Sequence, residues 1–281
     1  MTLTLQGNDA WIACKEQSRL VRVNAQSGKT TKTVRLGGPV IAIRSGFASV
    51  WALDSSATLY RLNPRTAKVV KRIPLPARAP YNIWMGGGSV WVADDRGASV
   101  LRISRRTNKV VARIVAGDGP ASMAFHGASA WVVNHRDTTV YRIDLAKNKS
   151  TLLARLGGAG DRAPERMVWL RDSLWITGRG TDLLEVSPAD GSIRRTIEIG
   201  ASGIDLVANG SDLWVPTRSA EVDPTGFPTM DALKRVSPSR DTVTTVAKPT
   251  SRLDVHGLAA ANRAIWIADN QNGYLYRVPA G

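Results

Sequence analysis

Short segments in which apolar and polar residues alternate follow one another along almost the entire chain. Two of them, KVVKRIPL at residues 68–75 and KVVARIVA at residues 109–116, are flanked by turns that contain glycine, proline or asparagine. Alternation with a period of two over a few residues is typical of a β-strand with one buried face. The pattern therefore predicts an all-β chain built from many short strands.

A tryptophan preceded by a small or apolar residue recurs at intervals of about 40 residues, which indicates an internal repeat. Each copy is followed by a second segment such as LYRLN or VYRID, a polar turn, an alternating segment and a link with glycine or proline. Each repeat thus holds four short strands, and such a sheet must stack against its neighbours around an axis to bury both faces. The seven tryptophans are Trp11, Trp51, Trp91, Trp131, Trp175, Trp214 and Trp266.

The repeat predicts a seven-bladed β-propeller with four-stranded blades of about 40 residues, because that period with four strands describes one propeller blade. Residues 2–6 stand where the innermost strand of the first blade belongs, and the chain stops before an outermost strand for the last blade. Either the last blade has three strands or the chain is a trimmed piece of a longer protein, and we favour trimming. The expected blades of this single domain cover residues 1–37, 38–78, 79–117, 118–160, 161–200, 201–252 and 253–281.

The amino-acid sequence of the repeat resembles that of a known group of bacterial propellers. The run GPASMAFHGASAWVVN, followed by VYRIDLAKNKS, is similar to the repeat of the YVTN-type and streptogramin B lyase-like propellers, and the resemblance extends over the whole chain. Proteins of this kind are mostly extracytoplasmic, so the resemblance implies a bacterial protein that is periplasmic or secreted. A monomer is expected.

The amino-acid composition narrows the classes of protein to which the chain can belong. Apolar residues make up 43% of the chain, enough for a sizeable core, and no apolar run approaches the roughly 18–20 residues that span a bilayer. Cys14 is the only cysteine, which excludes an intrachain disulfide and a cysteine-based metal site. The start of the chain lacks the pattern of a secretory signal, so any such signal is absent or has been removed.

The net charge of +15 implies attraction to polyanions, and the repeat predicts where the charge lies. The turns after the third strands read NAQSGK, NPRTAK, SRRTNK and DLAKNK, which places lysine and arginine on one face, the bottom. This basic bottom is either a solvated rim that keeps the protein soluble or a docking face for polyanions. The absence of aromatic residues in these turns argues against base stacking of single-stranded nucleic acid.

The opposite face, the top, carries polar residues around the predicted axial mouth. Residues at the start of each first strand should point to this mouth, and those of the third and the fifth to seventh blades are polar and ionisable. An insertion at residues 218–232 lengthens the sixth blade and is a candidate functional loop. The candidate ligand-binding residues are Tyr81, Asn82, Asn134, His135, Glu165, Arg166, Asp205 and Phe227.

His256 stands out because no other blade has a histidine at its position, and an imidazole titrates near neutral pH. The segment DVHGL, with WIAD after it, also resembles the active-site segment of streptogramin B lyases, roughly E-x-H-G-I and W-F-(T/A)-E. Those enzymes open a cyclic depsipeptide by elimination with Mg²⁺ held near glutamates. The resemblance implies an acid/base role for His256 and metal positions at Asp254 and Asp269, although both are aspartate and Val255 replaces a frequent proline.

Three functions therefore stay open at the level of sequence. The first, which we favour, is a non-catalytic domain that recognises a protein, peptide or small-molecule ligand on its top face. The second is a magnesium-dependent lyase centred on His256, and the third is a polyanion-docking module that uses the basic bottom. A propeller fold does not choose among them.

Overall fold

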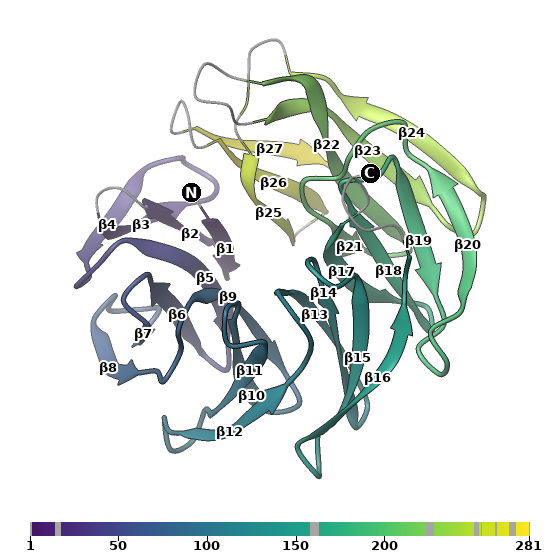
Figure 1. Ribbon diagram of the computed structural model, residues 1–281. Coiled ribbons are helices and arrows are strands. Elements are labelled where there is room, and N and C mark those ends of the chain that lie inside the picture. The colour runs from purple at the N-terminus through teal and green to yellow at the C-terminus, as the bar shows by residue number, and fades with distance from the viewer. Residues whose placement is uncertain are drawn as a thin grey trace.

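The computed structural model describes residues 2–14, 18–157, 163–222, 228–249, 253, 255–261, 263–269 and 274–280. In these residues the strands form seven antiparallel sheets, six with four strands and one with three, and each strand pairs with the next along the chain. The sheets stand around a common centre, as Figure 1 shows. The predicted seven-bladed propeller is confirmed, and its last blade has three strands.

The blades follow the order of the chain. The first three are β1 (Thr2–Gln6), β2 (Asp9–Cys14), β3 (Arg19–Asn24) and β4 (Thr30–Arg35); β5 (Val40–Gly46), β6 (Ser49–Asp54), β7 (Thr58–Leu62) and β8 (Val69–Pro74); and β9 (Pro80–Gly86), β10 (Ser89–Asp94), β11 (Ser99–Ser104) and β12 (Val110–Val115). The fourth and fifth are β13 (Pro120–His126), β14 (Ser129–Asn134), β15 (Thr139–Asp144) and β16 (Lys149–Arg155); and β17 (Pro164–Leu170), β18 (Ser173–Gly178), β19 (Asp182–Val186) and β20 (Ile193–Glu198). The last two are β21 (Val207–Asn209), β22 (Asp212–Val222), β23 (Pro228–Ser237) and β24 (Thr242–Ala247); and β25 (Val255–Ala261), β26 (Ala264–Asp269) and β27 (Leu275–Pro279).

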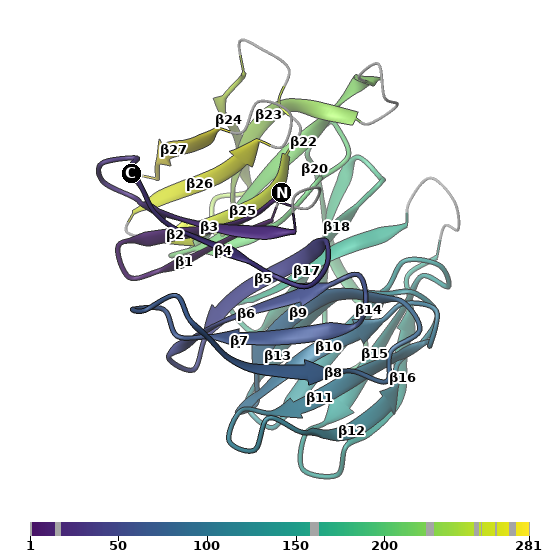
Figure 2. The same ribbon diagram turned by 90° about the vertical axis from the view of Figure 1, so that its left-hand side faces the viewer.

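The first strands of the blades line the centre of the ring, and each contacts the first strand of the next blade. The ring closes where β1 meets β25, and both views place these strands side by side (Figure 2). At this seam a side chain on residue 257 would start 2.8 Å from the backbone nitrogen of Leu3, which explains the glycine at position 257. The closure therefore depends on close backbone approach between the first and last blades.

The core lies between neighbouring blades rather than at one centre. Trp51 and Leu53 of the second blade, for example, pack against Ile83 and Val90 of the third. All seven repeat tryptophans are buried, and an arginine lies over each indole ring. The repeat is thus a packing unit in which a tryptophan fills the gap between blades and a cation covers it.

The insertion in the sixth blade is largely strand in the structure. Strands β22 and β23 continue their pairing beyond the other blades, with Arg218 opposite Met230 and Val222 opposite Pro228. The segment expected to be a loop therefore extends a hairpin over much of its length, while residues 223–227 lie outside the described part of the chain. No helix among the described residues is long and apolar enough to cross a membrane.

Candidate functional site

Polar side chains gather on the top face, which we define as the face where each first strand begins and each second strand ends. In the fifth blade Pro164 pairs with Gly178 and Arg166 pairs with Thr177, so Glu165 has no partner across the ladder. This bulge alters the direction of the side chains at the start of the strand. Related register shifts occur at the same point in the second, third, fourth and seventh blades.

Glu165 lies between two arginines that come from neighbouring blades. Its Oε1 atom is 3.1 Å from Nε of Arg179, and its Oε2 atom is 2.7 Å from Nη2 of Arg218. Arg179 and Arg218 each stand four residues after the repeat tryptophan of their blade, Arg179 directly past the end of β18 and Arg218 within the longer β22. The Nε atom of Arg218 is buried and has no hydrogen-bond partner in the described part of the chain. Within that part of the chain, a cationic donor on the top face is therefore unsatisfied.

A second ion pair lies next to the first. Nε of Arg166 is 3.2 Å from Oδ1 of Asp205, and the same oxygen accepts a hydrogen bond from the backbone N–H of Leu206. Arg44 of the second blade lies near enough to Asp205 and Arg166 for their charges to act on its pKa, and its Nη1 atom donates to the carbonyl of Ile43 at 3.0 Å. Arg166 is thus paired directly with Asp205, whereas Arg44 interacts with this carboxylate through its charge.

The pKa values of Arg44 and Arg166 are shifted in opposite directions. Burial lowers the pKa of Arg44 and nearby Arg166 lowers it further, while Asp205 offsets only part of the effect. Burial also disfavours the charge of Arg166, but the charges of Asp205 and Glu165 and a hydrogen bond that Arg166 donates to Tyr81 outweigh it and raise the pKa of Arg166. Both groups are cationic at any physiological pH, and Arg44 is the less well compensated of the two.

The third and fourth blades supply the rest of the polar rim. The rings of Tyr81 and His135 are 6.4 Å apart, and Nε2 of His135 lies 3.9 Å from Oδ1 of Asp95. Arg136 pairs with both Asp95 and Asp118. The side-chain amide of Asn82 accepts a hydrogen bond from the N–H of Ile83, its own neighbour. Of the predicted candidates, Tyr81, Glu165, Arg166 and Asp205 are brought into one connected cluster.

Two predicted residues lie inside their blades instead. Asn134 is fully buried and its Nδ2 atom donates to Oγ1 of Thr139 at 3.0 Å. Asp269 also has no exposed surface and ends β26 at the position that Asp54 and Asp94 occupy in their blades. The metal role that the lyase resemblance implies for Asp269 stays a prediction.

The remaining predicted site residues are Asp254 and His256 of the lyase resemblance and Phe227 of the ligand-binding rim. Asp254 and Phe227 lie outside the described residues, and for His256 only the backbone, in β25, is described. Among the described residues there is no group of three histidine, cysteine, aspartate or glutamate side chains that would hold a metal ion.

Arg44, Arg179 and Arg218 were not among the predicted site residues. The positions of Arg179 and Arg218 were available from counting four residues past the repeat tryptophan, at which the third and fourth blades carry Asp95 and His135. Arg44 is the lone charge in the apolar strand VIAIRSG, a signal that points to a special environment.

Comparisons with known proteins support the fold alone. No family model matches the chain, and no curated protein matches its sequence. Among solved structures, a chain of the mitotic checkpoint complex superposes with a TM-score of 0.81 at 11% identity, covering 99% of this chain and 86% of that one. The hydrazine synthase of Kuenenia stuttgartiensis gives 0.78 at 12%, covering 99% and 94%. The computationally designed Ika8 protein gives 0.73 at 8%, covering 99% and 82%.

Proposed function

We propose that the protein is a recognition propeller that binds an acidic peptide segment of a partner at the mouth of its axial channel. The observation that carries the proposal is the pairing of three guanidinium groups, those of Arg166, Arg179 and Arg218, with only two carboxylates, those of Glu165 and Asp205. A ligand carboxylate supplies the missing partner.

The charge balance of the cluster supports an anionic ligand. Arg44 adds a fourth guanidinium group near Asp205, so the cluster holds more cationic groups than the carboxylates of Glu165 and Asp205 can pair. Charge-assisted hydrogen bonds between arginine and carboxylate are among the strongest polar contacts, and they strengthen where water is partly excluded. The side chains of Arg166 and Arg218 are about three-quarters buried, with 25% and 23% exposed.

The unpaired donor of Arg218 supports the same proposal. A buried N–H without a partner costs free energy, so a site that leaves one open in the free protein gains when a ligand oxygen satisfies it. Arginine is also enriched at binding hot spots because its planar fork fixes the orientation of a carboxylate. A peptide is favoured over a single small anion because the polar rim continues from this cluster to Tyr81 and His135 of the third and fourth blades.

The test uses a fluorescently labelled hexaglutamate peptide, with hexaglutamine as the uncharged control, and fluorescence anisotropy at low ionic strength. We expect saturable binding of hexaglutamate alone and a loss of about 100-fold in affinity for the variant R44Q/R166Q, since each lost charge contact is worth roughly tenfold. The matched control K147Q/K149Q removes the same charge from a bottom turn and should retain binding to within about twofold.

Two outcomes would overturn the proposal. Equal affinity of wild type and R44Q/R166Q would show that the mouth does not bind the acidic peptide. A loss confined to K147Q/K149Q would instead favour the polyanion-docking function of the bottom face. Circular dichroism melts of each variant separate a binding defect from unfolding, and R218Q provides a second mouth variant that leaves the Arg166–Asp205 pair in place.

A further inference from the structure

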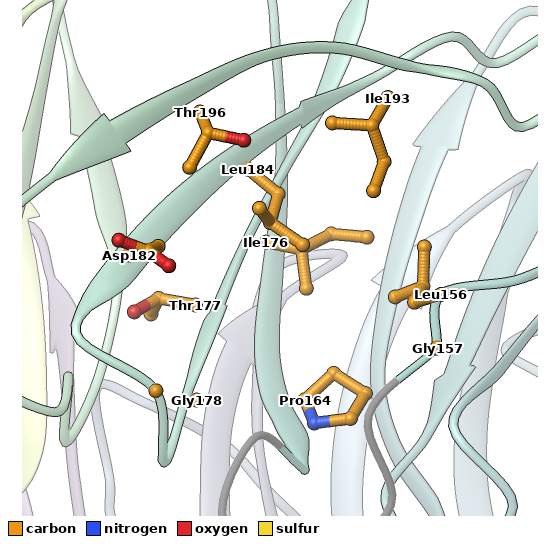
Figure 3. A pocket seen from close by; sticks show the side chains of 11 residues that line it. Leu156, Gly157, Pro164, Ile176, Thr177, Gly178, Asp182, Leu184, Ile193 and Thr196 are labelled. Atoms are coloured by element: carbon orange, nitrogen blue, oxygen red, sulfur yellow. The ribbon is translucent and has the colours of Figure 1, made fainter.

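A pocket of about 350 Å³ lies between the fourth and fifth blades, beside the end of β18 and apart from the axial mouth (Figure 3). Figure 3 shows Asp182 and Thr196 on one side of the pocket, with Leu156 and Ile193 opposite them. Ile176 and Leu184 lie between the two sides. The pocket is therefore mainly apolar, with a carboxylate and a hydroxyl on one wall.

In the third blade, the space that corresponds to this pocket is filled by the side chain of Arg113 from that blade. Nη1 of Arg113 donates to Oδ2 of Asp94 at 2.8 Å and to Oγ of Ser99 at 2.9 Å, and Nη2 donates to the carbonyl of Pro76. The guanidinium is thus held by three acceptors from the second strand, the third strand and the inter-blade link.

The strand register identifies the corresponding residues in the fifth blade. Arg113 pairs with Leu101, and Thr196 pairs with Leu184, so threonine replaces the arginine. The position of Asp94, three residues after the repeat tryptophan, is Gly178. A side chain at residue 178 would start 2.1 Å from the carbonyl oxygen of Ala163, so the lost aspartate cannot be replaced there.

Two acceptors remain in the fifth blade although the arginine is gone. Asp182 begins β19 as Ser99 begins β11, so a full carboxylate stands where the third blade has a hydroxyl. Alternation along the strand puts Asp182 on the same side as Leu184, toward the pocket. Gly157 corresponds to Pro76, because the preceding residues, Leu156 and Leu75, make the same backbone hydrogen bond in their blades. Within the described residues the side-chain carboxylate of Asp182 makes no hydrogen bond or ion pair, while its backbone pairs with that of Glu198.

We propose that this pocket binds a guanidinium group, presented by an arginine side chain of a partner peptide. The incoming guanidinium takes the place that Arg113 occupies in the third blade, with Asp182 as its anionic acceptor and the backbone of Gly157 on the opposite side. The apolar wall of Leu156, Ile176 and Leu184 packs against the methylene stem, which arginine readily buries while its charged head stays paired. This site is independent of the acidic-peptide site at the mouth.

The experiment is isothermal titration calorimetry with N-acetyl-L-arginine amide, compared with N-acetyl-citrulline amide, which has the same shape without the charge. We expect saturable binding of the arginine amide and at least about tenfold weaker binding of the citrulline amide. D182N should weaken arginine-amide binding by about tenfold. T196R should abolish binding, because it rebuilds the internal arginine of the third blade and fills the pocket. D231N, which neutralises an exposed carboxylate of the sixth blade, should bind like wild type.

Binding of both amides with equal affinity, unchanged affinity in D182N, or wild-type binding by folded T196R would each overturn the proposal. If T196R does not fold, D182N and the citrulline comparison still decide the question. The mouth variant R44Q/R166Q should bind the arginine amide normally, which keeps this result distinct from the outcome at the axial site.

Discussion

The third and fifth blades have the same four strands and the same repeat tryptophan, yet they stabilise their outer layers with different side chains. In both, an arginine lies over the indole ring with its guanidinium carbon 5.3 Å from the ring centroid. In the third blade this is Arg102 on the third strand, whereas in the fifth it is Arg195 on the fourth strand. The blade therefore accepts the arginine that covers the tryptophan from either its third or its fourth strand.

Where the arginine has moved to the fourth strand, the corresponding position of the third strand carries the opposite charge. In the third blade Arg102 donates to the hydroxyl of Ser89, whereas in the fifth Glu185 stands at the corresponding position and accepts from the hydroxyl of Ser173. Glu185 then binds Arg195 at 2.9 Å and holds it over the ring. Repeats that share a backbone can therefore exchange charges as long as the cation over the tryptophan is kept.

The shared part of the two blades should dominate their stability. Trp91 and Trp175 are both essentially fully buried, so W91A and W175A should each reduce the free energy of unfolding by about 3–5 kcal/mol through lost burial and a residual cavity. Urea denaturation followed by far-UV circular dichroism measures the loss. A much smaller loss at Trp175 than at Trp91 would mean that the fifth blade does not use its tryptophan as the others do.

The next largest effect should be confined to the third blade. Oδ1 of Asp94 accepts from the backbone N–H groups of Arg78 and Ala79, both at 2.9 Å, and Oδ2 binds Arg113, while Asp94 itself has no exposed surface. D94N retains the shape but removes the charge, and should cost about 1.5–3 kcal/mol in urea denaturation. The fifth blade, with Gly178, has no counterpart to lose.

The same carboxylate should make stability depend on acidity. Burial works to raise the pKa of Asp94, but the two N–H donors and Arg113 outweigh it, and the net pKa is lowered. A lowered folded pKa gives stability that is complete above the unfolded carboxyl pKa, near 3.9, and is lost as pH falls through the folded value. Below about pH 4, therefore, wild type should lose more stability than D94N, and parallel acid dependences would contradict the assignment.

The fold could be predicted from the sequence because it depends on features that recur from blade to blade. Seven tryptophans at regular spacing specify blade number, and period-two alternation specifies strands, so both predictions held. The polar cluster of the top face was predicted in part. Its residues Tyr81, Glu165, Arg166 and Asp205 were identified from their place near the start of a first strand. Arg44 was missed because the charges that act on it, those of Asp205 and Arg166, come from other blades, a proximity that no local pattern encodes. Asn134 was expected at the mouth, but its strand-end position turns it into the blade.

The relocated ion pair of the fifth blade gives a further test of the comparison. E185R alone should reduce stability by about 1–2 kcal/mol, since it breaks the charge-assisted bonds to Arg195 and Ser173 and places two cations together. Adding R195T should recover most of the loss, because the arginine then stands on the third strand as in the third blade. The measurement is a double-mutant cycle by urea denaturation, and additive losses would show that the two positions are not interchangeable.

The smallest expected effect concerns the two-residue turns that join the first and second strands. The third blade uses Gly87 and Gly88, with φ of 54° and 70°, and the fifth uses Arg171 and Asp172, with φ of 49° and 57°. Positive φ at both central residues favours Asn-Gly, since most side chains strain the backbone there. R171N/D172G should therefore raise the free energy of unfolding by about 1 kcal/mol without altering the ring. The charge-matched control R171Q/D172N tests whether the charges rather than the backbone matter, and a gain of equal size there would reject the conformational explanation.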